Sequence, residues 1–148
     1  MCAPGVVQKY LSKVSGPLLD RIDIHIEVTP VSFDELSGER KSEHSDTVRE
    51  RVIQAREIQT RRFDGSKTVF SNSQMGSSQV QEICKINPIG QKLLKTAMER
   101  LQLSARAYDR ILKVSRTIAD LAASDEIRPE HLAEAIQFRS LDRENWAG

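Results

Sequence analysis

The sequence predicts a mainly α-helical protein, in which a helical bundle begins near residue 44 and a short helix and a strand precede it. Charged residues make up 29% of the 148 residues and aromatic residues only 5%, a composition that suits solvated helices better than a β-sandwich. Residues 37–45, "SGERKSEHS", contain no apolar residue and indicate a linker. The chain therefore divides into residues 1–43 and 44–148.

The part before the linker combines two patterns. Apolar residues spaced by three and four predict a short helix over residues 3–13, opened by Pro4. From Ile22 to Val28 apolar and polar residues alternate, which predicts a strand whose isoleucines share a buried face and whose His25 lies on the water-exposed face. Because a lone strand leaves both edges unpaired, we do not expect this part to fold alone.

Three helices are predicted directly after the linker. The first runs to about residue 62 and is capped by Ser45 or Asp46. Its inward face is predicted to hold Val48, Val52 and Ala55, with Gln59 as a further candidate. A short helix is expected over residues 77–84. A third covers residues 88–101, capped by Asn87 and opened by Pro88.

The most regular helix is expected to begin after Ser104, a suitable N-cap. Its apolar seam runs over five turns from Ala107 to Leu121. A last helix opens at Pro129 and presents Leu132 to the core, with His131 among solvated glutamates. Cys84, beside apolar neighbours, is expected to be a small buried residue.

Two arginines are candidates for contact with phosphate. Arg21 precedes the predicted strand and could project beyond a sheet, where a planar, permanently charged guanidinium suits phosphate oxygens. The alternative is a surface pair with Asp20 or Asp23, worth less than ~1 kcal/mol. Arg106 lies in the first turn of the helix capped by Ser104, where backbone N–H groups are also free.

A line of basic residues continues from Arg106 along the same helix. Arg110, Lys113 and Arg116 follow at helical spacings and are candidates for contact with nucleic acid or with another subunit. The alternative is a solvated flank that Asp109 partly neutralises.

Several functions have no support in the sequence. The stretch "DGSKT", residues 64–68, lacks the glycine–lysine pair of a phosphate loop. A net charge of +1 gives no global attraction to nucleic acid or membrane, and no apolar run approaches the ~20 residues that span a bilayer. The three histidines share no motif with metal-ligand spacing, so no metal site is expected. Two distant cysteines favour a reduced, cytoplasmic protein.

Two long stretches carry a family resemblance. "YLSKVSGPLLDRIDIHIEV" and "LQLSARAYDRILKVSRTIADLAASDEIRPEHLAEAIQFR" resemble the C-terminal third of the magnesium-chelatase-like AAA+ ATPases of the ComM/YifB type. The resemblance implies that residues 1–43 end the α/β ATPase core and that 44–148 form its helical lid. It further implies that Arg21 is the arginine finger, acting on a neighbouring subunit, and that Arg106 is the sensor-2 arginine, which contacts the γ-phosphate within one subunit or across the interface.

The resemblance also implies ATP and Mg²⁺ as ligands of the full-length protein, a homo-oligomeric ring that is usually a hexamer, and a role as a DNA-processing motor. This chain alone is expected to bind neither ligand and to be inert, since it lacks the phosphate loop and the acidic magnesium motif. Two alternatives stay open. One is a helical DNA-binding module, whose contacts would be the row Arg106, Arg110, Lys113 and Arg116, or Arg61 and Arg62. The other is an accessory ATPase subunit of a magnesium–porphyrin chelatase.

Overall fold

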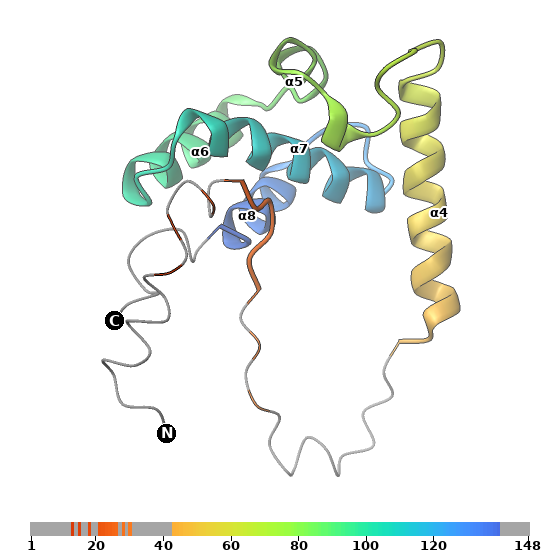
Figure 1. The fold of residues 1–148 in the computed structure, drawn as a ribbon, viewed down its shortest axis with the longest axis horizontal. Coiled ribbons are helices and arrows are strands. Elements are labelled where there is room, and N and C mark those ends of the chain that lie inside the picture. The colour runs from red at the N-terminus through yellow and green to blue at the C-terminus, as the bar shows by residue number, and fades with distance from the viewer. Residues whose placement is uncertain are drawn as a thin grey trace.

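The computed structural model describes residues 43–139 and 21–26, with single positions at 13, 15, 18, 28 and 30. Helices dominate this part of the chain, which confirms the mainly α class (Figure 1). Its one bridge between extended residues is an isolated parallel pair of Ile86 and Ile127. In chain order the elements are α4 (Ser45–Arg62), the 3₁₀ turn η1 (Asn72–Gln74), α5 (Ser77–Ile83), α6 (Pro88–Arg100), α7 (Ala105–Leu121) and α8 (Pro129–Gln137).

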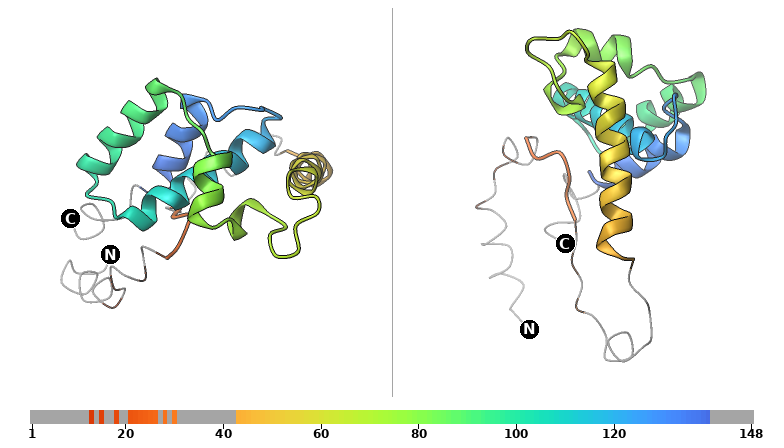
Figure 2. Two further views of the ribbon diagram at one scale, coloured as in Figure 1. Left: turned by 90° about the horizontal axis from the view of Figure 1, so that it is seen from above. Right: turned by 90° about the vertical axis from the view of Figure 1, so that its right-hand side faces the viewer.

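Helix α7 is the centre of the bundle. It packs against α4, η1, α5 and α8, while α6 joins the bundle through α8 (Figures 1 and 2). The core consists of apolar side chains from every helix except α4, together with loop residues. Its most deeply buried members are Val80, Leu94, Ile111, Leu112, Ala119, Leu132 and Ala135.

The starts of α6 and α7 follow the predicted local signals. Asn87 Oδ1 accepts the Gly90 N–H at 2.8 Å with Pro88 in the first turn, and Ser104 Oγ accepts the Ala107 N–H at 3.3 Å. Both predicted caps are confirmed. At Gly90 an added Cβ would lie 3.3 Å from Ile86 Cβ, so the absence of a side chain lets α6 pack closely here.

The predicted apolar faces are correct near the centre of the bundle and fail at its edge. Ala107 and Leu132 are buried as expected, but Leu121, at the end of the seam, is 42% exposed. His131 is buried rather than solvated, and its Nδ1 accepts the Arg128 N–H at 3.2 Å. The ring thus serves the start of α8 instead of facing water.

Helix α4 contacts the bundle with its C-terminal half. Ala55 and Gln59 are buried, whereas Val48 and Val52, which the sequence pattern turns inward, are 39% and 43% exposed. In Figure 1, α4 extends well past the end of α7, and in its first half Val48, Arg51 and Val52 face the end of α7 and Glu134 of α8 across a hollow. Its N-cap is His44, so the predicted cap at Ser45 or Asp46 is wrong.

The contact between α4 and α7 is fastened by a buried polar network. Two Arg62 nitrogens donate to the two Asp120 oxygens at 2.7 and 2.5 Å. Asn72 joins both, because its Oδ1 accepts from Arg62 and its Nδ2 donates to Asp120 at 2.8 Å. Gln59 Oε1 accepts the Asn72 N–H at 3.0 Å and completes the link to α4.

Arg116 completes this network from within α7. It is 3% exposed and donates from Nε to Asp120 at 3.1 Å, from Nη1 to the Asp125 carbonyl and from Nη2 to the Ser124 carbonyl. Its charge is paired with Asp120 inside the protein, and its two terminal nitrogens fasten the turn between α7 and α8. The prediction that Arg116 lies on a surface that contacts nucleic acid or another subunit is therefore wrong.

The predicted strand is absent from the described positions 21–26. Its backbone instead lies against the end of α8, where the His25 N–H donates to the Phe138 carbonyl at 2.8 Å and Arg139 Nη1 donates to the Ile22 carbonyl. The faces are reversed as well: His25 is 9% exposed, while Ile22, Ile24 and Ile26 are exposed. A strand needs a partner strand, and the described chain offers none. The helix predicted over residues 3–13 lies outside the described residues, except for position 13.

Candidate functional site

A pocket of about 220 Å³ lies beside the N-terminal half of α7. Three of the residues that line it are cations of α7, spaced by four and three positions and therefore on one helix face. The remaining wall comes from η1, from the 21–26 segment and from an acid of α7 itself. The lining residues are Asp23, Ser73, Arg106, Asp109, Arg110 and Lys113.

The three cations differ in how they are engaged. Arg106, in the first turn of α7, is exposed and forms no ion pair with another described residue. Arg110 forms an ion pair with Asp23. Lys113 Nζ donates to the Ser73 carbonyl at 3.1 Å. Arg106 is therefore the cation of this group with the greatest freedom to meet a ligand.

The electrostatic balance of the pocket is positive. Three cations face two carboxylates, and Asp109 is further occupied because its Oδ2 accepts from the Ser77 hydroxyl at 2.6 Å. The first turn of α7 adds the positive end of the helix dipole and free backbone N–H groups beside Arg106. This arrangement can hold an anion such as a phosphate; it contains no nucleophile paired with a base.

The structure brings together three of the residues singled out from the sequence, Arg106, Arg110 and Lys113. It does not bring Arg21 to them: Arg21 is exposed and does not line the pocket. The sequence reasoning missed Asp23 as a member of the site. The sequence offered Asp23 as a polar residue of an alternating strand and as a surface partner of Arg21, and its pairing with a residue 87 positions away has no local signal.

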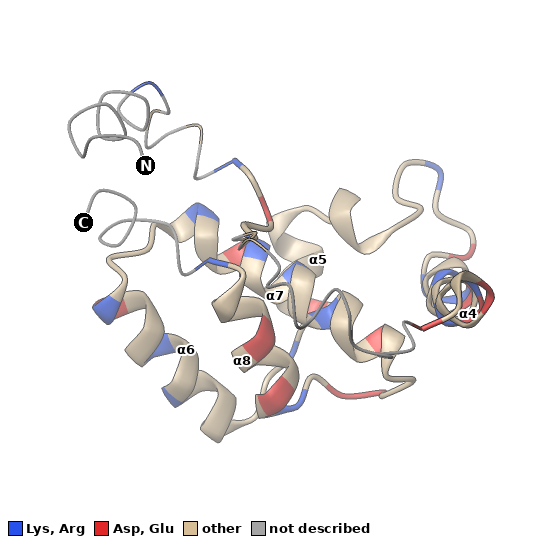
Figure 3. Ribbon diagram, turned by 90° about the horizontal axis from the view of Figure 1, so that it is seen from below, with Lys and Arg blue, Asp and Glu red and all other residues tan. Residues whose placement is uncertain are grey.

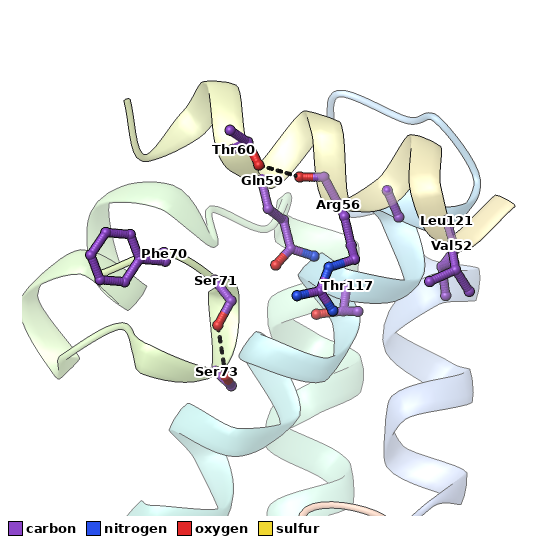
Figure 4. Close-up of a pocket in the computed structure, with 10 residues that line it drawn as sticks. Val52, Arg56, Gln59, Thr60, Phe70, Ser71, Ser73, Thr117 and Leu121 are labelled. Atoms are coloured by element: carbon purple, nitrogen blue, oxygen red, sulfur yellow. Dashed lines mark hydrogen bonds between the residues drawn. The ribbon is translucent and has the colours of Figure 1, made fainter. Parts of the chain in front are cut away.

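The larger hollow of about 390 Å³ between α4 and α7 is a weaker candidate (Figure 4). Arg56 extends into it from α4 and Phe70 lies at its far side, but no carboxylate lines it. Thr60 and Ser71 are used locally, donating to the Arg56 carbonyl and pairing with Ser73. The hollow thus offers one cation and scattered hydroxyl groups.

Other chemistry finds little support in the described residues. They hold no cluster of three His, Cys, Asp or Glu side chains that could bind a metal ion. Cys84 is buried as predicted, and burial raises the pKa of its thiol from 9.0 to about 11, so it is a poor nucleophile. Basic and acidic residues are interspersed, with basic positions along α6 and acidic ones on α8 (Figure 3). None of the described helices is long and apolar enough to cross a bilayer.

Comparison with known families agrees with the helical fold. The family described as "Magnesium chelatase, subunit ChlI C-terminal" matches residues 42–139, and "Magnesium chelatase, subunit ChlI" matches residues 1–36. The chain belongs to the magnesium-chelatase ChlI-like family and includes its C-terminal region.

The relatives place it in the ComM/YifB branch of that family. It is 43% identical to competence protein ComM of Haemophilus influenzae over 95% of this chain and 27% of the relative. It is 38% identical to the YifB proteins of Salmonella typhimurium and Escherichia coli, over 96% of this chain and 27% of each relative. The chain thus spans about a quarter of the length of these relatives.

Proposed function

We propose that this chain is the C-terminal region of an ATPase in which Arg106 contacts a nucleotide phosphate. The observation that carries the proposal is the position of Arg106: it is exposed in the first turn of α7 and lines a pocket with two further cations. A guanidinium there adds a forked pair of donors to the free N–H groups of the helix start. Membership of the ChlI-like family supports ATP as the source of that phosphate.

Arg21 has the second role in this proposal, as an arginine that acts on the nucleotide of a neighbouring subunit. Its exposure is compatible with contact to another protein chain. An arginine supplied in this way stabilises charge that develops on the transferred phosphoryl group and can contribute ~10³–10⁵ in rate. It also makes hydrolysis depend on assembly, which supports a homo-oligomeric ring, with six subunits as the size expected for the family.

The nucleotide site itself would be completed by residues that the described chain does not provide. Its residues fit phosphate oxygens but not Mg²⁺, because they hold no cluster of three acidic or histidine ligands. The chain by itself is therefore proposed to have no ATPase activity. We place the full-length protein in the cytoplasm, with ATP and Mg²⁺ as its ligands.

DNA is the proposed substrate of the full-length ring. One relative is named a competence protein, which supports a task in DNA processing over one in porphyrin metallation. The competing idea of a helical DNA-binding module has less support, because Arg116 is buried and Arg62 is held by Asp120 and Asn72. Two of the arginines on which that idea relied are thus occupied.

The test is steady-state ATP hydrolysis by the full-length protein. Arg106→Ala should lower kcat/KM roughly 10- to 100-fold, the loss expected for one hydrogen-bonded contact with a charged group. Arg21→Ala should lower kcat much further while nucleotide binding, measured by fluorescence titration, persists. Arg49→Ala removes an exposed arginine of α4 outside the pocket and serves as the matched control, with unchanged kinetics expected. If Arg106→Ala hydrolyses ATP like the wild type, Arg106 has no part in the nucleotide site.

A further inference from the structure

An acidic side chain already occupies the basic pocket of α7. Asp23 reaches it from the segment before the linker and pairs with Arg110, the middle cation of the row. The side chain of Asp23 is 48% exposed and that of Arg110 is 30% exposed. The pair therefore lies at the mouth of the pocket, where solvent reaches it. The carboxylate thus takes the position that an anionic ligand of Arg110 would take.

The same segment carries Arg21, two residues before Asp23. Besides the ion pair, it is held by the His25 N–H bond to the Phe138 carbonyl and by the Arg139 bond to the Ile22 carbonyl. The ion pair is therefore the one of these three contacts that involves α7 and the pocket. A ligand that takes Arg110 from Asp23 loosens the segment without disturbing the core.

We propose that Asp23 is an internal competitor for the basic pocket, so that a polyphosphate group binding beside Arg106 displaces Asp23 from Arg110 and loosens the 21–26 segment. This inference rests on the proposed function, since it takes the phosphate-binding role of the pocket as given. It adds a coupling between the two arginines: occupation of the pocket by phosphate changes how the segment bearing Arg21 is held.

Charge determines the direction of the effect. With Asp23 in place the pocket has three cations and two carboxylates; without it, three cations face Asp109 alone. Asparagine at position 23 removes both the competing ligand and its repulsion of an entering anion while keeping the shape of the side chain. An exposed ion pair of this kind corresponds to about a fivefold change in an equilibrium constant.

The experiment uses the 148-residue chain with inorganic tripolyphosphate as the probe. Binding is measured by calorimetry for the wild type and Asp23→Asn, and hydrogen exchange of the His25 amide is followed by NMR with and without the probe. Asp64→Asn, which neutralises an exposed acid outside the pocket, is the matched control, and Arg106→Ala tests whether the probe binds in the pocket. Circular dichroism verifies that each variant is folded.

We expect Asp23→Asn to bind tripolyphosphate about fivefold more tightly than the wild type and Asp64→Asn to match the wild type. Saturating probe should speed exchange of the His25 amide in the wild type about fivefold. Equal affinities together with unchanged exchange would overturn the competition while leaving phosphate binding by Arg106 intact. If the wild type and Asp23→Asn both fail to bind tripolyphosphate, or if Arg106→Ala binds it as tightly as the wild type, the pocket does not bind phosphate. The proposed competition by Asp23 is then refuted as well.

Discussion

Replacing Asp120 with asparagine should detach α4 from the bundle. Asp120 is 1% exposed and accepts hydrogen bonds from Arg62, Asn72 and Arg116. Asparagine keeps the shape but loses the charge, and its amide group turns a donor toward guanidinium donors. Arg116, with a side chain that is 4% exposed, would keep its buried charge without an opposing carboxylate.

The expected loss is large because the charges are buried. Removing one partner of a buried ion pair costs about 3–5 kcal/mol, since the remaining charge stays desolvated. Apolar packing cannot offset this loss in α4: of its 18 residues only Ala55 and Gln59 are buried. We therefore expect the loss to appear first in the contact of α4 with α7 and only then in the core around α7.

Urea denaturation followed by circular dichroism measures the effect. With a slope of about 1–3 kcal/mol per molar urea, the midpoint should fall by about 2 M. Hydrogen exchange should accelerate between Ala55 and Arg62 more than in α6. The control is Asp64→Asn, an exposed acid, whose midpoint should stay within the ~0.5 kcal/mol typical of surface changes. A loss below about 1 kcal/mol in Asp120→Asn would show that the network does not hold α4 in place.

Two further predictions concern Cys84 and Asn87. The thiol of Cys84, whose pKa burial raises from 9.0 to about 11, should stay protonated and unreactive toward iodoacetamide at pH 8.5 in a Cys2→Ser background; rapid labelling of the folded protein would contradict its burial. The thiol of Cys84 ionises near pH 9 in the unfolded chain and near pH 11 in the folded one. Its ionisation should therefore leave the free energy of unfolding unchanged below pH 9 and lower it between pH 9 and 11. Urea titrations of Cys84→Ala should not show this fall. Asn87→Ala, which deletes the cap of α6, should cost about 1 kcal/mol in the same assay; no loss would mean that the cap bond to Gly90 is replaced by water.

Signals that act over a few residues predicted their elements well. Asn87, Pro88 and Ser104 set the starts of α6 and α7 because an N-cap bond joins residues three positions apart. The apolar seam of α7 was correct for Ala107 and Ile111, which face the centre of the bundle. These features depend on helix geometry alone, which is why the sequence reveals them.

Features that depend on burial within the assembled fold were not predictable in this way. Hydropathy assigns Arg116 and His131 to water, yet both are buried because partners within the fold satisfy their polar groups. The alternation around His25 indicates which face a strand would bury, but not whether a partner strand exists. The candidate pocket was predicted in part: the cations share one helix face, whereas Asp23 reaches Arg110 only through the tertiary fold.

The exposed first half of α4 amplifies small rotations of the helix. At 1.5 Å per residue, the exposed turns before Ala55 are about 15 Å long, and the helix packs on the bundle from Ala55 onward. A tilt of about 10° at that contact therefore moves Ser45 by about 3 Å. The helix thus acts as a lever that pivots on its contact with α7, so a slight rearrangement beside α7 becomes a larger displacement at Ser45.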